Sequence, residues 1–261
     1  MNLEKIKQEV IELALEAGAF MKKERETFSF SKVELKGKND LVSYVDREAE
    51  KMIVARLKEI LPEAGFIAEE GTVAQGDEEL KWIIDPLDGT ANYTHGLPCY
   101  STSIALAKES ELLVGVVYDV EHDDCYHAYQ GGGAFCNEKK IQISDNSTLD
   151  TAMIATGFPY SAFHRVDDYL KILKDMLNEA QGVRRWGSAA LDLAYSARGW
   201  FEGFFEYNLN SYDVAAGALI LLEAGGKVTD FQGSEDFLFT REIVAANGCH
   251  QELLDVVQRH W

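Results

Sequence analysis

Between residues 66 and 144, short runs rich in β-branched and aromatic residues alternate with glycines or charged turns. Examples are STSIALA, LLVGVVYDV and DCYHAYQ. Runs of this length and composition are typical of strands. Because the runs follow one another closely along the chain, neighbouring strands are expected to pair antiparallel. The stretch YQGGGAFCNEKKIQIS is expected to form successive hairpin strands. The pattern predicts a largely antiparallel sheet.

Two helices are predicted before this region. Apolar residues recur at helical spacing over residues 3–26 and again from about residue 45 to residue 61, where Pro62 follows. Both patterns are amphipathic, so each helix needs an apolar surface to cover. We expect the pair to pack on one face of the sheet, which gives an α+β fold.

After Asp145, predicted strands and helices alternate. Strands are expected in AMIATGF, GFFEYN, KVTDF and EIVAAN, and helices in 166–180, SAALDLAYSARG, SYDVAAGALILLEAGG and from about His250. This half is expected to hold a second, mixed sheet. We divide the chain into residues 1–146 and 147–261, and the absence of a Gly/Ser linker between them predicts one integrated unit.

Composition excludes several classes of function. The net charge of −19 disfavours binding to nucleic acid or anionic lipid. No run of 18 apolar residues is present, so no membrane span is expected. The four cysteines are scattered without a CxxC pair, which disfavours zinc sites and disulfides. We expect a cytoplasmic protein, since the first residues mix charged with apolar side chains and do not read as a signal peptide.

The segment WIIDPLDGT combines features of a metal site. Asp85 and Asp88 follow an apolar run, and Pro86 stiffens the backbone between them. Carboxylate and carbonyl oxygens held in fixed relation suit hard cations such as Mg²⁺. Gly89 permits close approach of a ligand, and the Gly-Thr amides could face a phosphate. The alternative is that both aspartates merely cap a turn.

Further acids have comparable positions. Glu69 and Glu70 follow the apolar run GFIA, and Asp213 begins an apolar helix. Carboxylates at strand ends and helix starts can converge on one crevice. A turn-capping role for Asp85 and Asp88 leaves these acids unexplained, so we favour the metal site.

These segments resemble the inositol monophosphatase family. WIIDPLDGTANYTHGLP followed by SYDVAAGALILLEAGG carries the resemblance, and GFIAEEG, GVVYDVEHDDCYHAYQGGGAFCN and WGSAALDLAYSARG extend it over nearly the whole chain. The resemblance implies a layered αβαβα sandwich and a Mg²⁺-dependent, lithium-sensitive phosphomonoesterase. It also implies a homodimer.

The resemblance implies a role for each matching residue. Glu69, Asp85 and the carbonyl of Leu87 would hold one Mg²⁺, and Asp85, Asp88 and Asp213 a second, with Glu69 helping to hold a weaker third ion. Asp46 and Thr90 would position the attacking water, so Asp46, Thr90 and Glu69 form the predicted catalytic set. The amides of Gly89 and Thr90 would contact phosphate, and Ala189, Glu206 and Asp213 would bind the substrate.

The sequence leaves the substrate open. Myo-inositol monophosphate is the first candidate, and 3′-phosphoadenosine 5′-phosphate, fructose 1,6-bisphosphate and histidinol phosphate are alternatives. Tyr93-Thr94-His95 departs from the family's aromatic-basic pattern near the metal loop, so the resemblance specifies metal binding more firmly than the substrate. Arg184-Arg185 could meet phosphate or lie in solvent.

Besides a phosphatase for inositol phosphates and a related phosphatase for the other substrates, a third hypothesis is a metal-binding scaffold without catalysis. It is disfavoured because Asp46 and Thr90, the pair that would position water, are present together with the metal ligands.

Overall fold

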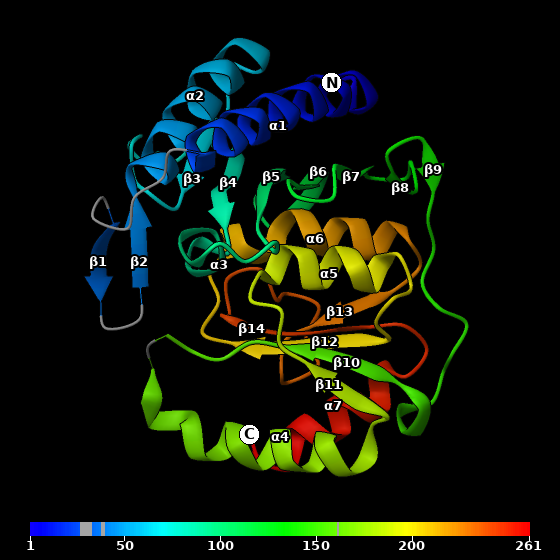
Figure 1. Ribbon diagram of the computed structural model, residues 1–261. Helices are drawn as coiled ribbons and strands as arrows, with labels where there is room; N and C mark the ends of the chain where they lie inside the picture. The colour runs from blue at the N-terminus through cyan, green and yellow to red at the C-terminus, as the bar shows by residue number, and fades with distance from the viewer. Residues whose placement is uncertain (27–32, 38–39, 161) are drawn as a thin grey trace.

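The computed structural model describes residues 1–26, 33–37, 40–160 and 162–261. Its helices and sheets stack in five layers (Figure 1). The helices α1 (Leu3–Glu26) and α2 (Tyr44–Ile60) lie above a larger sheet, and α5 (Ala189–Ala197) and α6 (Ser211–Glu223) lie between this sheet and a smaller one. Helices α4 (Val166–Glu179) and α7 (His250–Gln258) cover the far face of the smaller sheet. The predicted αβαβα sandwich is confirmed.

The larger sheet follows chain order. It contains β3 (Gly65–Ala68), β4 (Leu80–Asp88), β5 (Ser101–Lys108), β6 (Glu111–Asp119), β7 (Asp124–Tyr129), β8 (Ala134–Cys136) and β9 (Lys139–Lys140). Strands β3 and β4 are parallel, and every other neighbouring pair is antiparallel. The mostly antiparallel first sheet is therefore confirmed. A separate hairpin pairs β1 (Val33–Gly37) with β2 (Asp40–Ser43).

The smaller sheet is mixed, as predicted. It contains β10 (Met153–Thr156), β11 (Gly182–Arg184), β12 (Gly203–Tyr207), β13 (Lys227–Thr229) and β14 (Glu242–Ala246) in the order β11-β10-β12-β14-β13. Strand β10 runs parallel to β11 and β12, whereas β14 is antiparallel to β12 and β13. The division of the chain into residues 1–146 and 147–261 stays a prediction.

The helix pair α1 and α2 packs on one face of the larger sheet, as expected, and α6 covers the other face, because β4, β5 and β6 are buried on both faces and each face needs a partner. Two local details differ from expectation. In KIQIS, residues 141–144 lie outside any strand, and Ile143 packs against the core as the chain crosses to the second half. The short helix α3 (Thr90–His95) was missed because six residues are too few to show helical periodicity.

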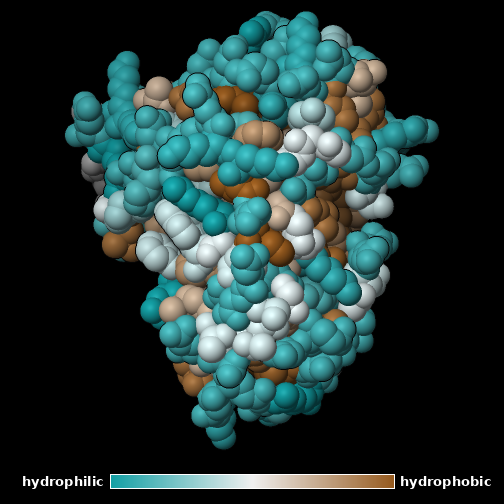
Figure 2. Space-filling model, turned by 90° about the vertical axis from the view of Figure 1, so that its right-hand side faces the viewer, coloured by the Kyte–Doolittle hydropathy of each residue, from teal (hydrophilic) through white to brown (hydrophobic). Residues whose placement is uncertain are grey.

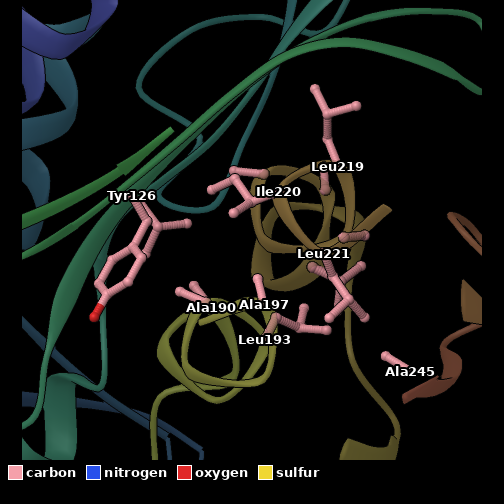
Figure 3. Close-up of a cluster of buried hydrophobic side chains, with 14 of the residues drawn as sticks. Tyr126, Ala190, Leu193, Ala197, Leu219, Ile220, Leu221 and Ala245 are labelled. Atoms are coloured by element: carbon pink, nitrogen blue, oxygen red, sulfur yellow. The ribbon is translucent and has the colours of Figure 1, made fainter. Parts of the chain in front are cut away.

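The central helices are apolar on all sides because each packs between two sheets. Buried side chains of α5 and α6, among them Leu193, Leu219 and Ile220, meet Tyr126 from β7 and Ala245 from β14 (Figure 3). A Cβ at Gly115 of β6 would lie 2.7 Å from the carbonyl oxygen of Ala216. The absence of that side chain lets α6 lie directly on β6.

The outer surface shown in Figure 2 is mostly hydrophilic, with apolar residues in separate patches. Among the described residues, no helix combines the length and apolar character needed to cross a membrane.

Candidate active site

A cavity of about 260 Å³ brings together residues from both halves of the chain. Apart from Asp46, every predicted site residue lines it: Glu69, Asp85, Leu87, Asp88, Gly89, Thr90, Ala189, Glu206 and Asp213. These residues come from or adjoin β3, β4, α3, α5, β12 and α6. The predicted convergence of acids from separate segments is therefore observed.

Strand β4 delivers two of the acids. Pairing between β4 and β5 becomes irregular between Asp85 and Asp88, so Pro86 lies within a distorted strand and not in a separate turn. The side-chain oxygen Oδ1 of Asp85 accepts a hydrogen bond from the backbone N–H of Leu87 at 3.0 Å. The distortion lets both carboxylates line the same cavity.

Gly89 joins β4 to α3 in a conformation that favours glycine. Its φ is +92°, and a Cβ would lie 2.9 Å from the carbonyl oxygen of Cys99. Helix α3 begins at the next residue, Thr90. The first N–H groups of a helix lack acceptors within that helix, so this turn offers donors to an anion in the cavity.

Asp46 does not line the cavity but contacts Thr90, which does. The hydroxyl of Thr90 lies 2.9 Å from Oδ1 of Asp46 and 3.0 Å from the carbonyl oxygen of Leu87. Donation to either oxygen leaves the hydroxyl's lone pairs available to accept a hydrogen bond from a third group. Asp46 is fully buried in α2, so this side chain can bind substrate only indirectly.

Asp88 connects the two halves. One of its oxygens, Oδ2, accepts hydrogen bonds from the hydroxyl of Ser188 at 2.6 Å and from the N–H of Ala190 at 2.8 Å. Both donors belong to the N-terminal end of α5, which also carries Ala189. The contacts seat α5 against the end of β4.

Asp213 and Glu206 approach from the second half. Asp213 lies in the first turn of α6 and accepts a hydrogen bond from the N–H of Asn210 at 2.6 Å, which forms half of a capping box. Glu206 lies in β12 and is buried. A Cβ at Gly157 would overlap the Glu206 carboxyl group, so a glycine there leaves room for it.

Burial of so many acids raises their pKa values. Burial and the charges of Glu69, Asp88 and Asp213 raise the pKa of Asp85 well above its usual range. Burial raises the pKa of Asp88 to about 6, against opposing hydrogen bonds from Ser188 and from the start of α5. Burial, with a smaller effect of Asp88, also raises the pKa of Asp213. Cations in the cavity would relieve this repulsion.

The donor set fits Mg²⁺. Buried carboxylates and a backbone carbonyl are the oxygen ligands that hard cations take. In the described part of the chain, no three His, Cys, Asp or Glu side chains are gathered closely enough to form a finished metal site. The acids share one cavity and repel one another, so an added cation would draw them together.

Sequence reasoning missed some cavity residues. Asp192, from α5, is buried, and its oxygen Oδ1 has no hydrogen-bond partner among the residues that the structure describes. The sequence feature that could have revealed Asp192 is a carboxylate within the otherwise apolar run AALDLA, three residues after Ala189. Arg185 and Tyr160 also line the cavity and share a hydrogen bond of 3.2 Å. Arg185 is thus the member of the arginine pair that reaches the site.

We predict that Glu206 makes the stability of the metal-free protein depend on pH. Burial raises the pKa of Glu206 from its usual value of 4.5 to about 8. Between these values the folded state retains a proton that the unfolded state releases, so the free energy of unfolding falls as the pH rises. E206Q should reduce this slope by up to roughly 1.4 kcal/mol per pH unit, measured by urea unfolding in chelator.

The matched control is E235Q, which removes an exposed carboxylate. Its pH profile should follow the wild-type profile. Equal slopes for E206Q and wild type would contradict the raised pKa.

The chain resembles known proteins over its full length. A profile of the inositol monophosphatase family matches residues 2–261. An inositol-1-monophosphatase from Mesorhizobium japonicum is 39% identical over 246 residues, covering 94% of this chain and 92% of that protein. The Nus factor SuhB of Escherichia coli (strain K12) is 40% identical over 238 residues, covering 91% of this chain and 89% of that protein.

A solved structure supports the same assignment. The inositol monophosphatase from Anabaena (Nostoc) sp. PCC 7120 superposes with a TM-score of 0.89 at 34% identity, covering 100% of this chain and 98% of that one. The matches agree with the fold described above. The chain therefore belongs to the inositol monophosphatase family and is a phosphatase.

Proposed function

We propose that the chain hydrolyses a small phosphate monoester with Mg²⁺, and that myo-inositol monophosphate is the first candidate substrate. The convergence of Asp85, Asp88 and Asp213 in one cavity carries the proposal. The three acids come from both halves, so we infer that residues 1–146 and 147–261 work as one catalytic unit. The contacts of Asp88 with α5 support this inference.

The residues divide into a metal-holding set and a substrate set. Two or three Mg²⁺ ions would be held by Glu69, Asp85, the carbonyl of Leu87, Asp88 and Asp213. Bound Mg²⁺ would supply positive charge that offsets the phosphate dianion and the charge that develops on the leaving oxygen. Gly89 and Thr90 would direct backbone N–H groups at the phosphate, and Ala189 and Glu206 would contact the leaving alcohol.

The pair formed by Asp46 and Thr90 would orient the attacking water. Donation of the Thr90 proton to Asp46 directs a lone pair of the hydroxyl toward the cavity. A water that donates a hydrogen bond to this lone pair turns its own lone pair toward the phosphorus. Positioning of this kind is the main protein contribution to phosphoryl transfer, so a covalent phosphoenzyme is not required.

Other substrates of the same class remain alternatives. They are 3′-phosphoadenosine 5′-phosphate, fructose 1,6-bisphosphate and histidinol phosphate. Arg185 and Arg241 both line the cavity and would favour a second anionic group on the leaving side. A panel of phosphomonoesters assayed with Mg²⁺ ranks these candidates.

A second candidate function comes from similarity to proteins named Nus factor SuhB. In that role the chain would act by binding a partner. Its net charge of −19 favours a protein surface over direct contact with nucleic acid. The chain is about equally similar to the named inositol-1-monophosphatase and to the named Nus factor SuhB, at 39% and 40% identity. We therefore propose both functions.

We also propose that the protein works in the cytoplasm. Cys99, Cys125, Cys136 and Cys249 are all buried and free. Free cysteines are typical of a reducing compartment.

Phosphatase activity should depend on Mg²⁺ and on Asp88. Chelation should abolish phosphate release, and D88N should lower kcat by roughly two orders of magnitude or more, since one ligand charge is lost. The variant should fold, because the asparagine oxygen can replace Oδ2 of Asp88, which accepts both observed hydrogen bonds. Circular dichroism checks the fold of the variant. The phosphate-release assay also tests the expected inhibition by lithium.

Turnover that survives exhaustive chelation would overturn the proposed metal dependence. Wild-type turnover by pure D88N would remove Asp88 from the site.

E206Q should separate substrate choice from chemistry. Above pH 8 the Glu206 carboxylate is ionised and can accept a charge-assisted hydrogen bond from a substrate hydroxyl. At pH 9 the variant should lose roughly 1–3 kcal/mol in kcat/KM for inositol phosphate, and much less for an aryl phosphate without hydroxyl groups. The loss should shrink at pH 6, where the wild-type carboxyl group also carries a proton.

The readout is the ratio of kcat/KM for the two substrates. An equal fall for both substrates would assign Glu206 to the fold or to the metal site.

The protein should form a homodimer. Phe158, Trp186 and Trp200 of the second half are each more than 40% exposed, so apolar surface is available for burial. Light scattering should give about twice the chain mass of 29.2 kDa. A mass of one chain at micromolar concentration would contradict the dimer.

A further inference from the structure

Helix α2 carries a second buried acid that the proposed chemistry does not use. Asp46 and Glu50 are four residues apart on this helix, so both lie on the same face. Both side chains are fully buried. Asp46 contacts Thr90, whereas Glu50 contacts the segment that follows β3.

Glu50 accepts three hydrogen bonds from that segment. Its Oε2 accepts the N–H of Glu70 at 2.7 Å. Its Oε1 accepts the N–H of Thr72 at 2.8 Å and the hydroxyl of Thr72 at 2.7 Å. A buried carboxylate is unfavourable without such partners, so these bonds hold Glu50 and the segment together.

These contacts flank Glu69. The N–H of Glu69 donates to the carbonyl oxygen of Ile84 in β4 at 3.2 Å, and the next residue is bound by Glu50. The backbone on both sides of Glu69 is thus fixed, by β4 on one side and by α2 on the other. The Glu69 side chain lines the cavity beside Asp85.

We propose that Glu50 is a positioning residue that holds the Glu69 carboxylate beside Asp85 for metal binding. The inference rests on the proposed metal-dependent function. Glu50 does not line the cavity, so it acts through Glu69. One helix face then serves both tasks of the site, because Asp46 orients Thr90 and Glu50 orients Glu69.

The test is Mn²⁺ binding to substrate-free protein, followed by electron paramagnetic resonance. Glutamine at position 50 has one acceptor oxygen, and its NH₂ group would face an N–H or O–H donor. E50Q should therefore weaken Mn²⁺ binding by about tenfold or more. The Mg²⁺ concentration for half-maximal activity should rise by a similar factor, with KM for substrate at saturating Mg²⁺ nearly unchanged.

E48Q is the matched control. Glu48 lies on the same helix but is exposed and pairs with Lys51. This variant should bind Mn²⁺ like the wild type. T72V, which removes one of the three donors and keeps both N–H groups, should show a smaller loss than E50Q.

A double-mutant cycle with E69A distinguishes positioning from general stability. If Glu50 acts through Glu69, E50Q should add almost nothing to the loss of Mn²⁺ affinity already caused by E69A. Losses that add in full would overturn the proposal, as would wild-type Mn²⁺ affinity in folded E50Q. If E50Q fails to fold, unchanged Mn²⁺ affinity in T72V overturns it.

The outcome separates this inference from the proposed function. Wild-type protein that binds no Mn²⁺ would refute the metal-dependent function itself. Normal binding by the wild type and by E50Q would refute the role of Glu50 alone.

Discussion

Repulsion among buried carboxylates is the constraint around which this structure is arranged. Asp85, Asp88 and Asp213 share one cavity, and burial raises the pKa of each. A fold that gathers like charges away from water must stabilise them with hydrogen bonds, with protons or with bound cations. The structure supplies hydrogen bonds to Asp88 and Asp213, and the raised pKa values show that like-charge repulsion persists, so a bound cation would relieve it.

The rest of the fold supplies the donors and the stability that this arrangement needs. The apolar helices α5 and α6 pack between the two sheets, and the N-terminal ends of both helices reach the cavity. The Ser188 hydroxyl and the Ala190 N–H bind Asp88, and the Asn210 N–H binds Asp213. The central core therefore stabilises the protein and also aims the donors at the acids.

Sequence reasoning succeeded where a local pattern carried the information. Helix α1 follows from apolar periodicity, and the strands β4 to β7 follow from short runs rich in β-branched and aromatic residues. The acids of WIIDPLD point to the candidate site because carboxylates beside a buried strand are unusual. It failed where the information was distributed. Strand β11 pairs through only three residues, and Glu50 reads as an ordinary helical glutamate until the segment after β3 is placed against it.

The sequence by itself determined the acids to consider and the family resemblance, which in turn implied the layered architecture, because motifs and their spacing are local properties of the chain. Tertiary structure alone decided which groups meet. It placed Ser188 on Asp88, Asp46 behind Thr90, and Asp192 with Glu206 in one cavity. Such contacts join residues up to 100 positions apart. Their geometry depends on how the helices pack between the sheets, and no local pattern encodes that packing.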